Sequence, residues 1–244
     1  MPHHDPHTPR FAREPNLSLP GAFRIFIRET PPRVLLLASA LLLGTRLASA
    51  TFTDWGALGI WDLVVLVALA LLHPFVEWCI HVYVLHWRPR NWLGLNIDFP
   101  AARYHRAHHV DPWDLRFVAM PLSAMFTGGA LLLALGWATL PTLGALHSVM
   151  LMAACLALTY EWCHFLTHTS YRPKGWAYKR IYRFHRLHHF KNEKYWMGVT
   201  RHLADYVLGT MKDAGEVESS KTAKDLMASF EAEAEAGPKA RASR

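Results

Sequence analysis

The sequence lacks charged residues over a long stretch: from Phe117 to Tyr160, 44 residues contain no Asp, Glu, Lys or Arg. A bilayer core requires about 20 apolar residues per helix, so this run is long enough for two membrane spans, with residues 136–141 as the turn between them. A buried helical hairpin in a soluble protein is the alternative, but uncharged runs of this length are typical of membrane proteins.

A second pair of apolar segments is almost free of charge. The only charged residue in residues 34–53 is Arg46, and the only charged residues in residues 60–80 are Asp62 and Glu77, near the two ends of that segment. Residues 54–56, Asp-Trp-Gly, are predicted as the turn between them. We therefore predict an all-α integral membrane fold with four transmembrane helices in two hairpins.

Acidic residues are outnumbered, 19 Asp and Glu against 26 Lys and Arg, and the formal net charge is +7. In a soluble protein this excess would suggest nucleic acid as a partner. Here the basic residues gather before the first span and in residues 81–116 and 161–202, whereas the two opposite turns carry only Arg46. The positive-inside rule then predicts that both termini and both basic segments are cytoplasmic, at a bacterial inner membrane or the endoplasmic reticulum, and no nucleic-acid partner is expected.

Cysteine is rare as well. Cys79, Cys155 and Cys163 form no C-x-x-C pair, which excludes a disulfide framework and the spacing of an iron–sulfur site.

Composition also predicts the boundaries of the membrane domain, residues 31–212. Residues 1–30 are expected to be a disordered or interfacial N-terminal segment, and residues 213–244 a polar C-terminal tail.

The two halves of the membrane domain resemble each other in sequence. Three stretches recur in the same order: Glu77-Trp78-Cys79 as Glu161-Trp162-Cys163, Trp87-Arg88-Pro89-Arg90 as Tyr171-Arg172-Pro173-Lys174, and Tyr104-His105-Arg106-Ala107-His108-His109 as Phe184-His185-Arg186-Leu187-His188-His189. Each half is therefore an apolar hairpin followed by a histidine-rich segment. Because a hairpin returns the chain to its starting side, both histidine segments are expected to meet in one cytoplasmic helical cap.

Ten of the 16 histidines fall into four groups just past the predicted spans: His81 and His86; His105, His108 and His109; His164 and His168; and His185, His188 and His189. Residues three and four apart share a helix face, so each H-x-x-H-H run is expected to point three imidazoles the same way. His81 and His86 are five apart. Either the helix ends or distorts between them, or the two rings reach different metals.

Ten convergent imidazoles indicate two metal ions with about five ligands each, because each neutral ring offers one nitrogen to a metal. A structural zinc site needs only four ligands, usually with Cys among them, and imidazole-rich sites suit iron or zinc. An isolated pair of histidines is more often hydrogen-bonded within the protein or exposed on its surface than bound to a metal. Four such groups at one membrane face are not explained in that way.

Other polar residues near the groups receive supporting roles. Glu77 and Glu161 each lie one turn before a histidine pair, and they are predicted to orient imidazoles rather than to bind metal, with a solvated helix end as the alternative. His202 is predicted to be either an extra ligand or a supporting residue. His147 lies inside a span without a spaced partner, so a helix–helix hydrogen bond is expected for it, and His73 is given a similar role.

These residues resemble the fatty acid hydroxylase/sterol desaturase superfamily of membrane di-metal oxygenases, and their spacing is most similar to that of the fatty acid 2-hydroxylases. The H-x4-H, H-x2-H-H, H-x3-H, H-x2-H-H pattern is matched at all ten histidines. Around it, the stretch from His108 to Arg116 and the stretch from His188 to Asn192, followed by Gly198-Val199-Thr200, Asp205 and Gly209-Thr210, are similar to segments of that family. The resemblance covers roughly residues 60–212.

The resemblance implies two iron ions held by the ten histidines, with zinc as a possible replacement on isolation. It also implies O2 as co-substrate and hydroxylation of an unactivated C–H bond in a lipid acyl chain, with no catalytic residue beyond the metal centre. Asp114 and Asn192 join the supporting residues. Some relatives carry a haem-binding His-Pro-Gly-Gly motif, but here His73-Pro74 continues as Phe75-Val76. Electrons are therefore expected from a separate cytochrome b5-, ferredoxin- or reductase-type protein.

Alternative functions remain open. A desaturase or hydroxylase of a sterol or another ring lipid would use the same metals. Carotenoid hydroxylases tend to carry Asp where this chain has Arg106 and Arg186, which argues against a carotenoid. A metal transporter is disfavoured because transport sites lie near the bilayer midplane, whereas these histidines lie at and beyond the ends of spans. A non-catalytic membrane anchor would have no use for ten spaced histidines.

Overall fold

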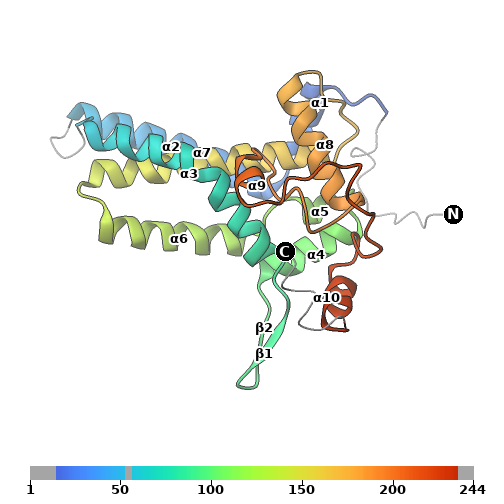
Figure 1. Cartoon of the computed structure of the whole chain (residues 1–244). Helices are drawn as coiled ribbons and strands as arrows, with labels where there is room; N and C mark the ends of the chain where they lie inside the picture. Colours follow the sequence, from blue (N-terminus) through green and yellow to red (C-terminus); the bar gives the residue numbers. More distant parts are fainter. Residues whose placement is uncertain (1–14, 53–56, 236–244) are drawn as a thin grey trace.

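The computed structural model of the chain describes residues 15–52 and 57–235, which form helices, one short β-hairpin and the loops that connect them (Figure 1). The predicted turn at residues 54–56 and the two ends of the chain lie outside the described residues. In chain order the elements are α1 (Leu19–Phe26), α2 (Thr30–Phe52), α3 (Ile60–Ile80), the π-helix η3 (His81–Leu85), β1 (Arg90–Trp92), β2 (Leu95–Ile97), α4 (Pro100–Val110), α5 (Leu115–Val118), α6 (Leu122–Thr139), α7 (Leu143–Thr167), α8 (Trp176–Phe190), α9 (Leu203–Val207) and α10 (Leu226–Glu235).

Four helical stretches are long and apolar enough to span a membrane, as the sequence predicts. They are Thr30–Phe52, Ile60–Leu85, Leu115–Thr139 and Leu143–Thr167. In Figure 1 these stretches run side by side, and α7 contacts each of α2, α3 and α6. The chain is therefore built as an integral membrane protein around α7. The side of the membrane on which each end lies stays a prediction.

The turn between α6 and α7 lies between Thr139 and Leu143, close to the predicted position. The hydroxyl of Thr142 accepts a hydrogen bond from the N–H of Ala145 at 3.0 Å and caps the start of α7. Gly136 allows the two helices to approach, because a Cβ there would lie 2.6 Å from the side chain of Leu146. A larger residue at position 136 would displace the end of the Leu146 side chain on α7.

A buried polar cluster joins three spans at the end of the bundle away from the histidines. The guanidinium of Arg46 on α2 donates to Asp62 on α3 at 2.5 Å and to Ser148 on α7 at 2.9 Å. The hydroxyl of Ser148 also donates to Asp62 at 2.5 Å. A charged side chain inside a membrane is costly without a partner. This pairing explains how the apolar segments tolerate Arg46 and Asp62.

The histidine-bearing helices α4 and α8 lie together at one end of the spans (Figure 1). On the same end α1 packs against α7: Phe26 is buried, and its ring centroid lies 5.0 Å from that of Trp162. The described part of the N-terminal segment is thus held on the bundle by aromatic contacts.

Residues 213–235, predicted as a polar tail, pack against the cap. Leu226 is only 1% exposed. The N–H of Ser220 donates to the carbonyl of Lys191 at 2.7 Å, and the buried carboxylate of Glu193 accepts from the hydroxyls of Thr222 and Ser229 at 2.8 and 2.7 Å. The segment is polar in composition, but its polar groups are used to attach it to α8 and the loop that follows.

Candidate metal centre

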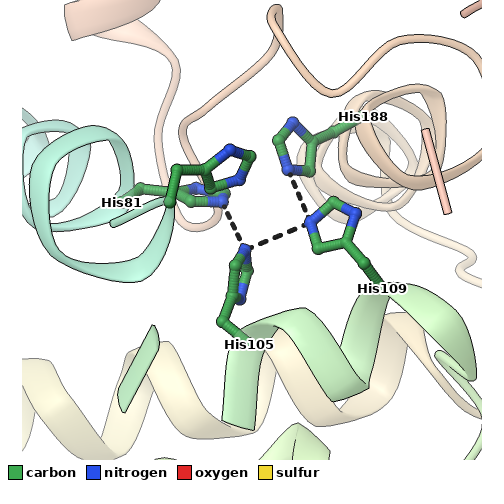
Figure 2. A group of neighbouring side chains, drawn as sticks. His81, His105, His109 and His188 are labelled. Carbon is green, nitrogen blue, oxygen red and sulfur yellow. Dashed lines mark hydrogen bonds between the residues drawn. The ribbon is translucent and has the colours of Figure 1, made fainter. Parts of the chain in front are cut away.

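The structure brings the ten predicted histidines together in two clusters of five. Group 1 contains His81, His86, His105, His109 and His188, and group 2 contains His108, His164, His168, His185 and His189. In each group, every histidine has one ring nitrogen that faces the others, and these five nitrogens all lie within 4.8 Å of one another. Figure 2 shows four rings of group 1 pointing toward one another from η3, α4 and α8.

A π-helix accommodates the five-residue spacing of His81 and His86. The N–H of His86 donates to the carbonyl of His81 at 3.0 Å, which is the i to i+5 pattern of this helix type. The wider turn brings both rings into group 1, with their centroids 5.0 Å apart. Of the two possibilities that the spacing left open, the structure has the distorted helix, and both rings serve the same group.

The middle histidine of each H-x-x-H-H run belongs to the opposite group from its two companions. On α4, His105 and His109 lie in group 1 and His108 in group 2; on α8, His185 and His189 lie in group 2 and His188 in group 1. The prediction that each run points three rings at one site is therefore wrong. Consecutive residues of an α-helix differ by about 100° around the axis, so two adjacent histidines diverge toward different centres.

The rings of group 1 direct lone pairs toward one another. Nδ1 of His109 donates to the carbonyl of Ala223 at 2.8 Å, and Nδ1 of His188 donates to that of Tyr195 at 2.9 Å. Burial lowers the pKa of each of these two rings to about 3, so both are neutral at neutral pH. In a neutral ring whose Nδ1 carries the proton, Nε2 carries a lone pair. The two Nε2 atoms are 3.2 Å apart, and a cation between them would remove their repulsion.

The nitrogen spacing in group 1 matches that of ligands on one ion. Two imidazole nitrogens about 2.1 Å from a metal and at right angles to each other are about 3 Å apart. Nε2 of His105 lies 3.2 Å from Nε2 of His81 and 3.1 Å from Nε2 of His109, as the dashed lines of Figure 2 mark. The donor set and its spacing therefore fit a metal ion bound by nitrogen.

Group 2 has the same character. Nε2 of His168 lies 3.1 Å from that of His108 and 2.9 Å from that of His185. Burial holds the pKa of all three rings well below the usual value for histidine, so they are neutral. Among the described residues, Nε2 of His164 is buried and has no hydrogen-bond partner. A metal ion would give this nitrogen the partner that a buried polar atom requires.

Backbone carbonyls orient three rings of group 1. Nδ1 of His81 donates to the carbonyl of Met197, in addition to the bonds from His109 to Ala223 and from His188 to Tyr195. All three carbonyls belong to the segment that follows the last histidine of α8. Acceptors of this kind fix the tautomer and the orientation of a metal-binding ring. Sequence reasoning missed them because every residue carries a carbonyl, and no residue type signals its use.

Glu77 and Glu161 hold backbone segments near the groups. The carboxylate of Glu77 accepts hydrogen bonds from the N–H groups of Val199 and Thr200, the latter at 2.8 Å. The carboxylate of Glu161 accepts from the N–H of Met120 at 3.0 Å. These equivalent residues of the repeat therefore support the cap by attaching loops to α3 and α7, instead of by the predicted direct bonds to the ten rings.

The other predicted supporting residues also contact groups outside the ten rings. Asp114 accepts from the N–H of Arg116 at 3.1 Å at the start of α5 and pairs with its guanidinium. Asn192 accepts from the N–H of Lys194 at 3.0 Å and donates to the carbonyl of Glu218 in the C-terminal segment at 3.2 Å. His202 belongs to neither group, so the structure does not make it an eleventh ligand. Its Nδ1 lies 3.3 Å from the carboxylate of Asp205.

Asp205 organises the loop that carries the carbonyl of Met197. It is fully buried and accepts hydrogen bonds from the N–H groups of Met197 and Gly198 at 2.7 and 2.9 Å and from the hydroxyl of Thr210 at 2.6 Å. Burial raises the pKa of this carboxyl, but the hydrogen bonds, including that from His202, outweigh it and hold the pKa below its usual value. The residue therefore stays ionised and holds the loop in place.

The two isolated histidines inside spans differ in their contacts. Nε2 of His147 lies 3.0 Å from the carbonyl of Leu42 and 3.0 Å from the hydroxyl of Thr45, both on α2. The predicted helix–helix contact of His147 is thus confirmed. His73 lies 3.9 Å from the carboxylate of Glu77 on its own helix. Neither ring belongs to group 1 or group 2.

A small cavity reaches both groups. Its volume is about 20 Å³, the space of about one water molecule, and His105 of group 1 and His164 of group 2 line it. The rest of its wall comes mainly from apolar and aromatic residues, among them Leu85, Phe117 and Tyr160. A larger apolar groove of about 570 Å³ lies between α1, α2 and α7, but none of the ten histidines lines it.

Comparison with known proteins gives a family and a fold. The model of the family described as "Fatty acid hydroxylase" matches residues 66–210, a range that contains all ten histidines. Among solved structures, the chain is similar to the visible hydroxylase domain of full-length scs7p, with a TM-score of 0.63 and 21% sequence identity. That match covers 85% of this chain and 76% of the other, and at this identity it shows a shared fold. A search of curated proteins finds no match.

Proposed function

The chain belongs to the fatty acid hydroxylase family, and from this premise we propose that it uses two iron ions and O2 to hydroxylate an unactivated C–H bond of a lipid acyl chain. The observation that carries the proposal is the pair of buried five-histidine clusters at the ends of apolar spans. A purely structural role would require neither two nitrogen-rich cavities nor their position at the membrane boundary.

In this proposal each group of histidines holds one metal ion. Neutral imidazole suits iron, copper, nickel and zinc, and the family favours iron among these. Zinc binds such sites more tightly than ferrous iron and can replace it during expression. When bound, the two irons supply the O2-dependent oxidation of the C–H bond.

The small cavity marks where the lipid would approach the metals, and its volume of about 20 Å³ would have to widen to admit an acyl chain. Leu85 ends the span Ile60–Leu85, and Phe117 and Val118 lie at the beginning of the span Leu115–Thr139, so the wall of the cavity lies at the membrane boundary. An apolar wall binds an acyl chain and excludes water. Among the described residues, those that line the cavity include no carboxylate, Lys, Cys or Ser. In this proposal the lining residues position the acyl chain beside the metals, and the chemistry comes from the metal centre.

Electrons would come from a separate protein of the cytochrome b5, ferredoxin or reductase type. The histidine groups and both termini would face the cytoplasm, since the basic segments lie on that side of the spans. A sterol or other ring lipid, oxidised by hydroxylation or desaturation, is the alternative substrate on the same metals. A metal transporter is disfavoured because the histidines lie at the ends of the spans rather than at their middle.

Lipid mass spectrometry tests the proposal directly. Cells that express the chain are compared with cells that carry the empty vector. We expect an acyl-containing lipid with one added oxygen in the first sample alone. A loss of two hydrogens would indicate a desaturase, and a modified sterol would indicate the ring-lipid alternative. Unchanged lipids in cells that contain folded, metal-loaded protein and a competent electron donor would refute the proposal.

Metal analysis tests the site independently of the substrate. Purified protein should contain about two equivalents of iron or zinc per chain. One equivalent or none in the intact protein would contradict the two-metal assignment, whatever the lipid result.

A further inference from the structure

The β1–β2 hairpin extends away from the rest of the cap (Figure 1). It joins η3 to α4, so both of its ends lead to histidines of group 1. Its tip exposes large apolar side chains: Trp92 is 63%, Leu93 83% and Leu95 66% exposed. Contiguous apolar groups of this kind on a projecting element mark a surface that binds something.

The pairing of the two strands gives the hairpin an apolar and a polar face. Trp92 pairs with Leu95, and Asn91 pairs with Asn96. Directly paired residues of an antiparallel ladder point to the same face, and successive residues point to opposite faces. Trp92 and Leu95 therefore share one face, and the two asparagines share the other. The tip of the hairpin is therefore amphipathic, and the residues from Arg90 to Asn96 are all exposed.

The turn of the hairpin presents another apolar side chain at a conformational cost. Leu93 and Gly94 both have positive φ, +51° and +80°, as the two central residues of a tight hairpin turn require. Glycine and asparagine adopt this conformation readily, but for leucine it is strained. A strained residue persists where its side chain has a use, and here that side chain lies at the exposed tip.

The hairpin is placed where the membrane boundary must be. It begins five residues after Leu85, the last residue of the span Ile60–Leu85. In Figure 1 it runs crosswise to the spans and lies level with the end of α6 that adjoins the cap. It is therefore oriented along the plane of the membrane, at the level where hydrocarbon gives way to headgroups.

The charges of the hairpin favour an anionic lipid surface over a basic or apolar protein. Arg88 lies two residues before the first strand and Arg90 begins it, while the acidic Asp98, just after the second strand, is paired with Arg106 at 2.6 Å. Tryptophan and arginine are typical of the membrane interface, where the ring lies among headgroups and the guanidinium reaches phosphates.

The base of the hairpin is fixed to the cap. The ring nitrogen of Trp87 donates to the carbonyl of Ile97 at 3.1 Å, and the rings of Trp87 and Phe99 lie 5.0 Å apart. Arg106 on α4 donates to the carbonyl of Trp87 at 3.0 Å. The direction of the hairpin is therefore set by α4.

We propose that the β1–β2 hairpin is a membrane-interface anchor, which inserts Trp92, Leu93 and Leu95 among the lipids of the leaflet on the side of the histidine groups. The partner of the hairpin is the bilayer itself, with anionic phosphate headgroups beside Arg88 and Arg90. Because the hairpin is attached to α4 and follows η3, the anchor holds these two histidine-bearing elements at a constant depth relative to the lipid surface.

Neighbouring residues on opposite faces of β2 provide the test. Full-length protein is prepared with Cys79, Cys155 and Cys163 replaced by alanine and with a single new cysteine, Leu95→Cys or Asn96→Cys. Each is labelled with a small environment-sensitive fluorophore and placed, one chain per disc, in nanodiscs of phosphatidylcholine and phosphatidylglycerol. Quenching is measured with a nitroxide on the lipid acyl chains and, separately, with iodide in the water. Lys221→Cys, at an exposed position of the C-terminal segment, is the control for water access.

We expect the label at position 95 to be quenched by the lipid nitroxide and protected from iodide, with the reverse at position 96. The label at position 221 should respond to iodide alone. Equal iodide quenching at positions 95, 96 and 221 would overturn the proposal, because the hairpin would then lie in water. Shielding of position 95 from both quenchers would also overturn it, since a protein surface would cover the apolar face. Unfolding midpoints equal to that of the unmodified chain show that the variants are folded.

Discussion

At the scale of single residues, histidine has two distinct uses in this chain, and one helix contains both. His147 near the start of α7 contacts the carbonyl of Leu42 and the hydroxyl of Thr45 on the neighbouring span. His168, just after the end of the same helix, lies in group 2 with its Nε2 near those of two other rings. The first ring has satisfied partners, whereas the second needs a cation to relieve its crowded nitrogens. The two residues should therefore respond differently to substitution.

We expect His168→Ala to abolish lipid oxidation and to lower the metal content from about two equivalents per chain to about one. His147→Ala should keep both metals and most of the activity, because it loses only an interhelical hydrogen bond, about 1 kcal/mol. Metal content and lipid products are measured on the two variants at equal protein abundance. An active His168→Ala beside an inactive His147→Ala would show that the ligand set is wrong and that the site lies deeper in the membrane.

Asp205 is a residue whose charge, rather than its size, supports the metal centre. Asp205→Asn keeps the shape but removes the carboxylate that accepts from Met197 and Gly198. We expect a loss of about 1–3 kcal/mol of stability at neutral pH. The thermal unfolding midpoints of the variant and of the unmodified chain measure it, with the exposed Asp213→Asn as control.

The pH dependence of this difference has a definite sign. The pKa of Asp205 is lowered in the folded protein, so its carboxylate contributes fully above the unfolded pKa of about 3.9 and progressively less as the pH falls through the lower folded value. The two midpoints should therefore converge below about pH 4. A difference that stayed constant down to the acid limit would mean that Asp205 acts through packing and not through its charge.

At the scale of elements, the C-terminal segment has an unexpected connection to the metal centre. The carbonyl of Ala223 accepts the Nδ1 proton of His109, and Leu226 at the start of α10 is buried three residues later. The family match ends at residue 210, so this segment is an addition to the part of the chain that the family shares. Because it orients a ring of group 1 and contacts no ring of group 2 by hydrogen bond within the described residues, its loss should affect the two metals unequally.

Adjacent residues of α10 test this connection. Leu226 is 1% exposed and Met227 is 42% exposed. Leu226→Asp places a charge where the segment packs, so we expect the segment to detach and group 1 to lose its metal, which leaves about one equivalent per chain. Met227→Asp should keep about two. The same metal content in both variants, with detachment verified by faster proteolysis of the C-terminal segment in Leu226→Asp, would show that His109 does not depend on Ala223.

Sequence patterns predicted some elements better than others, for physical reasons. The four spans follow from the length of apolar runs, which is a local property, and the structure has all four. The strands of the hairpin have only three residues each, too few for an alternating pattern to be distinguished from a loop. For His81 and His86 the spacing predicted only that the helix ends or distorts between them or that the rings reach different metals. The π-helix itself was not predicted, because its i to i+5 bond depends on the rings that the helix must bring together.

At the scale of the whole molecule, the two halves of the repeat are linked through the two histidine groups. Group 1 takes four histidines from the first half and His188 from the second, and group 2 takes four from the second half and His108 from the first. Neither half contains a complete group. If each group binds one metal ion, as proposed, both halves must be in place before either ion has five ligands, and metal binding is then coupled to the folding of the whole membrane domain.

The topology of the whole chain is the remaining prediction. Both histidine segments and the C-terminal segment lie at one end of the spans, and the turn between α6 and α7 lies at the other (Figure 1). Reporter fusions at the C-terminus and in the turn Trp137–Gly144 should therefore report opposite sides of the membrane, with the C-terminus cytoplasmic. A reporter signal on the same side for both positions would contradict the arrangement of four complete spans.

The sequence by itself determined the membrane spans, the ten histidines and the family, because these depend on run length, residue type and spacing along the chain. The sequence also predicted the helix–helix contact of His147, because this residue lies inside a span without a spaced histidine partner. Only the tertiary structure decided to which group each ring belongs, since His108 and His188 join the group opposite to that of their helix neighbours. The carbonyls of Met197 and Ala223 and the loop contacts of Glu77 and Glu161 likewise depend on segments far apart in the chain. Such contacts do not require a particular residue type or spacing along the chain, and so no pattern in one sequence can reveal them.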